Sequence, residues 1–310
     1  MLKAVIDIGT NSTRLCIARV ERTEGTVSVS QVRKYLTTTR LGQGSADGTL
    51  KREPMERTAN AVAGFAAAAA EAGAQELYVY ATAAVREAEN RDAFSRMLLQ
   101  NGVKLQLLSG EQEALIAFTG AANAEDTAVI DIGGGSTEVM VKHDGQVRAM
   151  SRKLGAVRLQ ERFGGSDGID CRMLQRVKEA IAPELECYES IRPFDARTLV
   201  GVSGTATTLG AVKLGMRQYS DAVQGTVLTL GQIRQLAEQL MQPLADRMLI
   251  PGVPQDRADI IPFGTIILES FMSRWGFDSL TVSDRDSLEG FLMLSEDPSF
   301  GAIPCRCGKN

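Results

Sequence analysis

Two stretches of the chain carry the same pattern of apolar and polar positions. Val5 to Ile8 and Val129 to Ile132 are apolar runs interrupted only by an aspartate, and each stops at a glycine before polar residues follow. This pattern predicts a buried strand, a tight turn and a returning strand, because glycine adopts backbone conformations that other residues avoid. The stretches lie 124 residues apart and agree at seven positions, so they predict an internal duplication.

The remaining periodicity predicts an α/β protein of two domains. Residues 26–35 are expected to add an edge strand to the first hairpin, and short buried strands then alternate with helical patterns. A small, polar linker at 120–126 gives domains 1–122 and 123–295, while the tail of about 296–310 either trails off or packs back on the first domain. The expected helices are 54–73, 90–101, 109–122, 170–191, 229–241, 259–275 and 284–294, and the other expected strands are 76–82, 103–108, 199–202 and 280–283.

Composition fits an ordinary globular protein of the cytoplasm. Hydrophobic residues make up 44% of the chain, yet no apolar run approaches the roughly 18 residues that span a bilayer. Met1 leads directly into a strand without a signal-peptide pattern, and five cysteines suit reduced thiols better than a disulfide framework. Cys305 and Cys307 form a pair in the tail, but two thiols without a nearby histidine favour a disordered end over a metal site.

The charge balance limits both the partners and the chemistry. A net charge of −4 gives no general attraction for nucleic acid or a membrane, so any anionic ligand must be held locally. His143 is the only histidine, and the following Asp144-Gly145 pair predicts a hairpin turn, which favours an exposed turn residue over a catalyst. Proton transfer is therefore expected to depend on carboxylates.

The glycine turns are the candidate phosphate sites. Backbone N–H groups in such turns form a concave set of donors, and the neighbouring Ser136 and Thr137 add hydroxyl groups. A third turn, Ser203 to Thr208, follows a strand and leads into a helix, whose N-terminus can also hold phosphate. An ordinary strand-to-helix turn remains the alternative interpretation of that third stretch.

The helix expected from residue 109 begins with two candidate bases. Ser109 and Gln112 have the spacing of a capping box, and Glu111 and Glu113 fall in the first turn. Two residues apart on a helix means roughly 200° apart, so at most one of these glutamates can share a site with Asp131. The spacing does not decide which one. Arg86, just beyond a strand end, is expected either to point into a ligand crevice or to form an inter-domain salt bridge.

Five motifs in order resemble the exopolyphosphatase and guanosine pentaphosphate phosphohydrolase family, nearly end to end. They are Asp7-Ile8-Gly9-Thr10-Asn11-Ser12, residues 81–91, Ser109-Gly110-Glu111-Gln112-Glu113-Ala114, the turn from Asp131 to Glu138, and Ser203-Gly204-Thr205. The resemblance implies two ribonuclease H-like domains of the actin, sugar kinase and Hsp70 superfamily, with mixed sheets and an active-site cleft between the domains. It also implies hydrolysis of terminal phosphoanhydride bonds of inorganic polyphosphate, and it selects Glu113 as the catalytic residue.

Roles for the other candidates follow as a hypothesis from that chemistry. Asp131 and Glu138, with Asp7 as a weaker third ligand, are expected to hold Mg²⁺ or another divalent cation. The expected phosphate-binding residues are Gly9, Thr10, Asn11, Ser12, Arg14, Arg86, Gly133, Gly134, Gly135, Ser136, Thr137, Gly204 and Thr205. Together these donors would neutralise and clamp the phosphate oxygens, as phosphoryl transfer requires.

Several alternatives remain open at the level of sequence. Guanosine pentaphosphate presents the same terminal bond as polyphosphate, an ATP-dependent kinase or ATPase uses similar paired turns, and a non-catalytic sensor of polyphosphate or guanosine tetraphosphate needs only the binding residues. The chain resembles the short, two-domain form of the family, which leaves processivity open. It carries Leu288 where many relatives have arginine, so that role is not transferred. The apolar stretch 259–275 suits either a homodimer interface or a buried helix.

Overall fold

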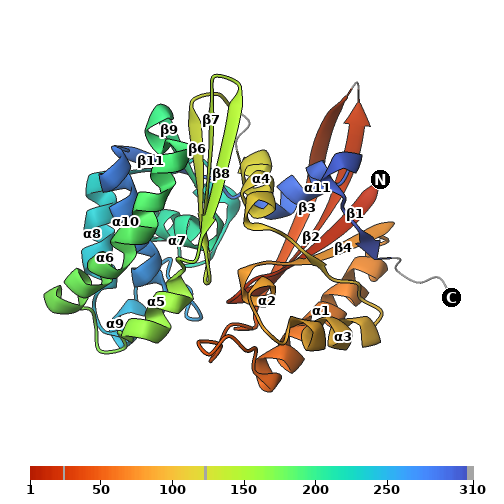
Figure 1. The fold of residues 1–310 in the computed structure, drawn as a ribbon, viewed down its shortest axis with the longest axis horizontal. Coiled ribbons are helices and arrows are strands. Elements are labelled where there is room, and N and C mark those ends of the chain that lie inside the picture. The colour runs from red at the N-terminus through yellow and green to blue at the C-terminus, as the bar shows by residue number, and fades with distance from the viewer. Residues whose placement is uncertain (24, 122–123, 306–310) are drawn as a thin grey trace. The chain divides into compact units, whose positions relative to one another are not determined.

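A computed structural model describes residues 1–23, 25–121 and 124–305. The chain forms two compact units, one of Met1–Gly120 with Ser287–Asn310 and the other of Ala121–Asp286. The boundary predicted at 122 and 123 falls on residues outside the described part. Figure 1 shows that each unit has a sheet with helices packed on it.

The sheet of the first unit is built around the first glycine-turn hairpin. Strand β1 (Leu2–Ile8) pairs antiparallel with β2 (Ser12–Thr23), and β3 (Thr26–Thr38) lies at the edge, as the sequence predicts. On its other side β1 pairs in parallel with β4 (Glu76–Ala81). The order is β12-β4-β1-β2-β3, where β12 is Pro304–Cys305, and β5 (Gln106–Leu107) also pairs with β4.

Alternating residues of β1 supply the two cores of this unit. Ala4, Ile6 and Ile8 face a cluster with α1 (Arg52–Glu71) and α3 (Arg91–Gln100), whereas Val5 faces the opposite cluster. Because successive side chains of a strand point to opposite faces, the consecutive apolar residues Ala4 to Ile6 contribute to the cores on both sides of the sheet. The other helices in the N-terminal part of this unit are the short α2 (Ala83–Arg86) and α4 (Gly110–Ala121).

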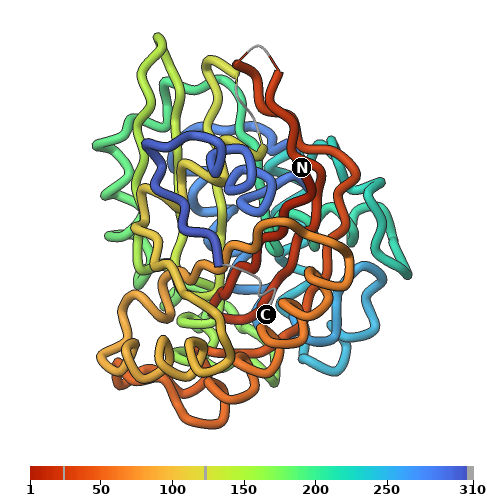
Figure 2. The backbone as a smooth tube through the Cα atoms, turned by 90° about the vertical axis from the view of Figure 1, so that its right-hand side faces the viewer, coloured from red at the N-terminus to blue at the C-terminus, as the bar shows by residue number. Residues whose placement is uncertain are grey.

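The last helix belongs to the first unit, although its stretch was assigned to the second domain by the sequence. Helix α11 (Ser287–Leu294) packs on β1, β2 and β3, and this blue segment lies beside the red strands in Figures 1 and 2. Leu288 and Phe291 are buried there, and Gly290 approaches the backbone of Ile116 so closely that no side chain fits between them. The apolar face of α11 therefore completes the first unit's second core.

The tail also returns to the first unit. Strand β12 (Pro304–Cys305) pairs antiparallel with β4, and the Cys305 thiol contacts the backbone of Lys104. Cys307 lies outside the described residues, so the structure does not test the prediction that the two cysteines form no metal site. Within the described part of the chain, no helix is long and apolar enough to cross a membrane.

The second unit repeats the strand arrangement of the first. Strands β6 (Thr127–Ile132), β7 (Thr137–His143) and β8 (Gln146–Arg152) form the antiparallel part, and β9 (Thr198–Val202) and β11 (Ser279–Val282) add parallel strands beside β6. The order is β10-β11-β9-β6-β7-β8, with β10 (Val227–Thr229) at the edge. The prediction of two ribonuclease H-like α/β domains with mixed sheets is confirmed, as is the duplication.

Helices of the second unit enclose one large core. Helix α10 (Ile261–Trp275), predicted at 259–275, is buried along most of its length inside this unit. Thr229 opens α8 (Leu230–Leu240), as the sequence predicts, and forms a capping box with Gln232. The remaining helices are α5 (Ala156–Phe163), α6 (Cys171–Glu186), α7 (Ser203–Lys213) and α9 (Leu244–Arg247).

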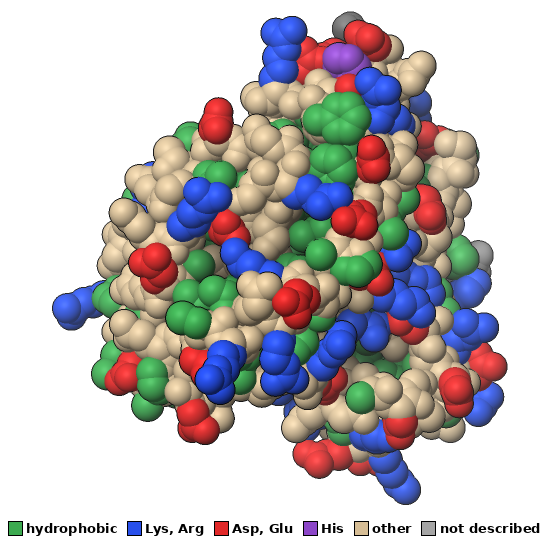
Figure 3. All heavy atoms as spheres, turned by 60° about the vertical axis from the view of Figure 1, so that its left-hand side comes forward, with side chains coloured by type: hydrophobic (Ala, Val, Ile, Leu, Met, Phe, Trp, Pro, Cys, Tyr) green, Lys and Arg blue, Asp and Glu red, His purple; other side chains and the backbone are tan. Residues whose placement is uncertain are grey.

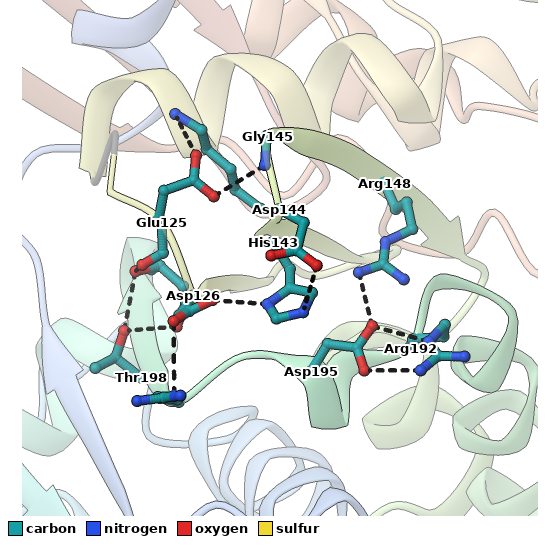
Figure 4. Close-up of polar contacts among 12 residues, drawn as sticks. Glu125, Asp126, His143, Asp144, Gly145, Arg148, Arg192, Asp195 and Thr198 are labelled. Atoms are coloured by element: carbon teal, nitrogen blue, oxygen red, sulfur yellow. Dashed lines mark hydrogen bonds and ion pairs between the residues drawn. The ribbon is translucent and has the colours of Figure 1, made fainter.

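The only histidine lies at the end of the second sheet that is remote from its glycine turn. His143 ends β7 beside the start of β6, and its Nδ1 lies 2.6 Å from Asp126 Oδ1 (Figure 4). Glu125 accepts a hydrogen bond from Gly145 N at 3.1 Å, which ties the β7–β8 turn to the start of β6. Figure 3 shows the histidine (purple) at the surface beside acidic side chains (red). This position supports a structural role for His143.

Candidate active site

The polar candidates gather where parallel strands end. In the first unit β1, β4 and β5 all stop at the same edge, followed by the Gly9 turn, Arg86 and the start of α4. In the second unit β6, β9 and β11 stop together, followed by the Gly133 turn and the start of α7. Ligands of α/β sheets bind outside the carboxyl ends of the strands, so each unit presents its candidates where that rule predicts.

The two glycine turns have the same geometry. Gly9 N donates to Ser12 O at 3.0 Å, and the matching bond from Gly133 N to Ser136 O is 2.9 Å. In both hairpins four residues connect the paired positions Ile8 with Thr13 and Ile132 with Thr137. The duplicated sequence therefore folds into duplicated turns.

The rest of the chain binds the carbonyl groups of these turns. Thr10 O and Asn11 O accept hydrogen bonds from the backbone of residues 39–42, at 2.7 to 3.0 Å. Within the described residues, the N–H groups of Thr10, Asn11 and Gly134 take part in no backbone hydrogen bond. Carbonyls that are already hydrogen-bonded, beside N–H groups without a backbone partner, suit the concave donor set that binds an anion.

The start of α5 fixes the second turn from behind. Ala156 N donates to Gly133 O and Val157 N to Gly134 O, each at 2.9 Å. Gly155 makes this approach possible, since a Cβ there would lie 2.5 Å from Gly135 N and nearer still to the Gly134 carbonyl. The three glycines of the turn are thus matched by a fourth glycine that the sequence pattern did not single out.

Asp7 and Arg14 form an ion pair in the first unit. They are directly opposite in the β1–β2 pair, and Arg14 Nε donates to Asp7 Oδ2 at 3.1 Å. Arg14 Nη2 also donates to the Ser287 hydroxyl at 3.0 Å. The two candidates predicted here are therefore brought together as an ion pair, which makes Asp7 a weak candidate for a metal ligand.

The corresponding position in the second unit holds two carboxylates. Asp131 and Glu138 are directly opposite in the β6–β7 pair, in the same register as Asp7 and Arg14. Ser203 Oγ donates to Asp131 at 2.7 Å, and Ser151 Oγ donates to Glu138 at 2.6 Å. Like charges directly across a strand pair repel each other, and a cation between them would remove that cost. Two carboxylates beside a candidate phosphate-binding turn match the sparse protein ligation that Mg²⁺ prefers.

The structure distinguishes the two glutamates of α4. Glu111 is exposed, and hydrogen bonding to its own backbone N–H and to Ser109 lowers its pKa. Glu113 is 8% exposed and forms an ion pair with Arg86, whose Nη1 also donates to Leu108 O at 2.8 Å. Arg86 and Glu113 are thus brought together within the first unit. The predicted capping box of Ser109 and Gln112 is present, so the start of α4 is fixed as expected.

Gly204 and Thr205 lie in the first turn of α7, and Thr205 Oγ1 donates to Ile132 O at 3.0 Å. This contact joins the third candidate turn to the Gly133 turn. The guanidinium of Arg257 fills the space where a side chain at Gly204 would lie, and Arg158 Nε donates to Gly135 O at 2.6 Å. Sequence reasoning missed both arginines. Gly155, just before the helix that carries Arg158, could have indicated that this arginine lies near the turn. Arg257 lies in a loop far along the chain, and no sequence pattern links it to the site.

Comparison with known proteins identifies relatives along most of the chain. Residues 16–298 match the model of the Ppx/GppA phosphatase family. Exopolyphosphatase 2 of Mycobacterium tuberculosis is 31% identical over 94% of this chain and 97% of its own length. A guanosine-5'-triphosphate,3'-diphosphate pyrophosphatase of Photobacterium profundum is 30% identical over 94% of this chain, which spans 58% of that protein. A crystal structure of the Aquifex aeolicus member of the Ppx/GppA proteins has 29% identity and a TM-score of 0.77, covering 96% of this chain and 99% of its own.

Proposed function

The chain belongs to the Ppx/GppA phosphatase family, and from this premise we propose that it is an exopolyphosphatase. It would hydrolyse the terminal phosphoanhydride bond of inorganic polyphosphate and release orthophosphate. The observation that carries this proposal is the pair of equivalent glycine turns, one followed by an arginine and the other by a carboxylate in the same register. Donors for phosphate and ligands for a cation are both required for phosphoryl transfer.

Glu113 is proposed as the general base that takes the proton from the attacking water. Its burial and its ion pair with Arg86 hold the carboxylate in one orientation, as a base must be held near its target proton. Arg86 would then contact both the base and the substrate. With a single histidine at the far end of the second sheet, a carboxylate is the natural group for this task.

Asp131 and Glu138 would hold Mg²⁺, which supplies charge neutralisation at the phosphate oxygens when bound. The N–H groups of the two turns, together with the hydroxyl groups beside them, would bind the remaining oxygens of the substrate. Arg14, Arg158 and Arg257 would add positive charge around these turns. Such fixed donors explain how a chain of net charge −4 could bind a polyanion.

Guanosine pentaphosphate is the second candidate substrate. The P. profundum relative carries that activity in its name and matches this chain over a similar length. In contrast, the chain covers almost the whole length of the M. tuberculosis exopolyphosphatase, which favours polyphosphate. Cytoplasmic location and a homodimer stay predictions from the sequence.

Phosphate release from short polyphosphate, long polyphosphate and guanosine pentaphosphate, each with and without Mg²⁺, tests the proposal. Glu113→Gln should lower the rate at least about 10²-fold while polyphosphate still binds, because the base is lost and the phosphate donors remain. Glu111→Gln is the matched control on the exposed side of the same helix turn, and it should retain nearly full activity. Normal turnover in Glu113→Gln would refute the role of this base. Polyphosphate binding without any metal-dependent release would indicate a sensor instead.

A further inference from the structure

The junction between β9 and α7 contains an unfavourable backbone conformation at a serine. Ser203 has a φ of 60°, in the left-handed region that residues other than glycine seldom adopt. The glycine that could adopt it without cost, Gly204, is the next residue and has no positive φ. Residues in such conformations are found where the surrounding structure requires them, often at functional sites.

The conformation of Ser203 brings its hydroxyl to Asp131. Val202 is paired with Asp131 in the parallel β6–β9 ladder, and the next residue turns so that Ser203 Oγ donates to Asp131 Oδ2 at 2.7 Å. The carbonyl of Ser203 is meanwhile held by Thr207 Oγ1 at 2.9 Å in the first turn of α7. The Ser203 carbonyl is thus held by helix α7, and the Ser203 hydroxyl is held by the Asp131 carboxylate.

In the first unit the residue at the position of Ser203 cannot make this contact. There Asp7 pairs with Tyr80 as Asp131 pairs with Val202, so the residue matching Ser203 is Ala81, which lies within strand β4 and has no hydroxyl. Asp7 is held by Arg14 instead. A strained serine therefore occurs in the copy with two facing carboxylates and is missing from the copy in which an arginine already orients the aspartate.

We propose that Ser203 is a positioning residue that orients Asp131 as a ligand for the divalent cation. The inference rests on the proposed function, because it assumes that Asp131 binds the cation. In this role the unfavourable φ of Ser203 is retained because it accompanies the hydrogen bond from the Ser203 hydroxyl to Asp131. A hydrogen-bonded ligand keeps one orientation, and loss of such a bond typically weakens metal binding by about 10- to 100-fold.

Two substitutions separate this role from a structural one. Ser203→Gly removes the hydroxyl and also relieves the backbone, so it should keep or raise the melting temperature while weakening metal binding about tenfold. Ser203→Ala removes the hydroxyl alone and should weaken binding equally without the gain in melting temperature. The probe is Mn²⁺, which accepts the same oxygen ligands, titrated against the whole protein and followed by electron paramagnetic resonance.

Two controls make the outcomes distinct. Asp144→Gly relieves a similar φ of 51° in the β7–β8 turn, at the end of the sheet that is remote from Asp131. It should therefore leave Mn²⁺ affinity unchanged. Asp131→Asn should abolish binding at this site, and wild-type affinity in that variant would overturn the metal assignment itself. If Asp131→Asn loses Mn²⁺ while Ser203→Gly and Ser203→Ala bind it as the wild type does, the role of Ser203 alone is refuted.

Discussion

Gly155→Ala is the sharpest test of how the second glycine turn is held. Gly155 has φ −141° and ψ 155°, which alanine adopts freely, so the whole effect of the substitution is steric. The added Cβ would lie 2.5 Å from Gly135 N and closer to the Gly134 carbonyl, and neither backbone atom can swing aside as a side chain would. The start of α5 and the turn must therefore move apart by about 1 Å to reach ordinary contact distance.

The cost can be worked out from the contacts that this movement breaks. Overpacking alone costs about 1–3 kcal/mol. The hydrogen bonds from Ala156 and Val157 to the turn would stretch as well, at about 1 kcal/mol each. The variant should thus lose about 3–5 kcal/mol of unfolding free energy in the second unit. Phosphate release should fall about 10²-fold, since a displacement of about 1 Å misplaces the donors.

Urea unfolding followed by tryptophan fluorescence measures the loss where it occurs. Trp275 is the only tryptophan and lies in the second unit with Gly155. Gly231→Ala is the matched control, because this exposed helical glycine of α8 leaves ample space for a Cβ, and the substitution should be neutral or stabilise by up to about 1 kcal/mol. A Gly155→Ala protein with a stability within 0.5 kcal/mol of wild type and normal activity would contradict this account; that threshold is roughly the range of neutral surface substitutions.

Two further predictions concern carboxylates of the second unit. Burial raises the pKa of Glu269, but hydrogen bonds from Lys178, Arg234 and Ser273 lower it, and the net pKa is below its ordinary value. The stabilisation is then fully present above the unfolded pKa of about 4.3 and is lost as the pH falls through the folded pKa. Because Lys178 and Arg234 are partly exposed, Glu269→Gln should reduce the acid-induced loss of unfolding free energy by only about 1 kcal/mol; equal pH slopes would contradict this. Ser151→Ala removes the hydrogen bond to Glu138 and should raise the Mg²⁺ concentration for half-maximal phosphate release about tenfold, and an unchanged requirement would exclude a role for this serine in orienting the carboxylate.

Local patterns were enough to predict the elements that carry the site. The two glycine turns, the capping box before Glu113 and the helix start at Thr229 depend on residues a few positions apart, and all are present. Turns and caps depend on backbone conformation and short-range hydrogen bonds, which neighbouring residues determine. The same reasoning left Glu111 and Glu113 unresolved, because helical spacing separates two sides but does not say which side is buried.

Only the tertiary structure decided which side chains meet. Arg86 pairs with Glu113, which is 27 positions away in the chain, and Ser203 donates to Asp131, which is 72 positions away. Arg257 contacts Gly204 across 53 positions. Helix α11 could be predicted as a helix, but its place in the first unit depends on an apolar face that fits the free side of β1 to β3. The hydrophobic effect favours burial of an apolar face but does not specify the surface that buries it. The sequence pattern therefore determined whether each segment forms a helix or a strand, and tertiary packing determined which segments contact each other.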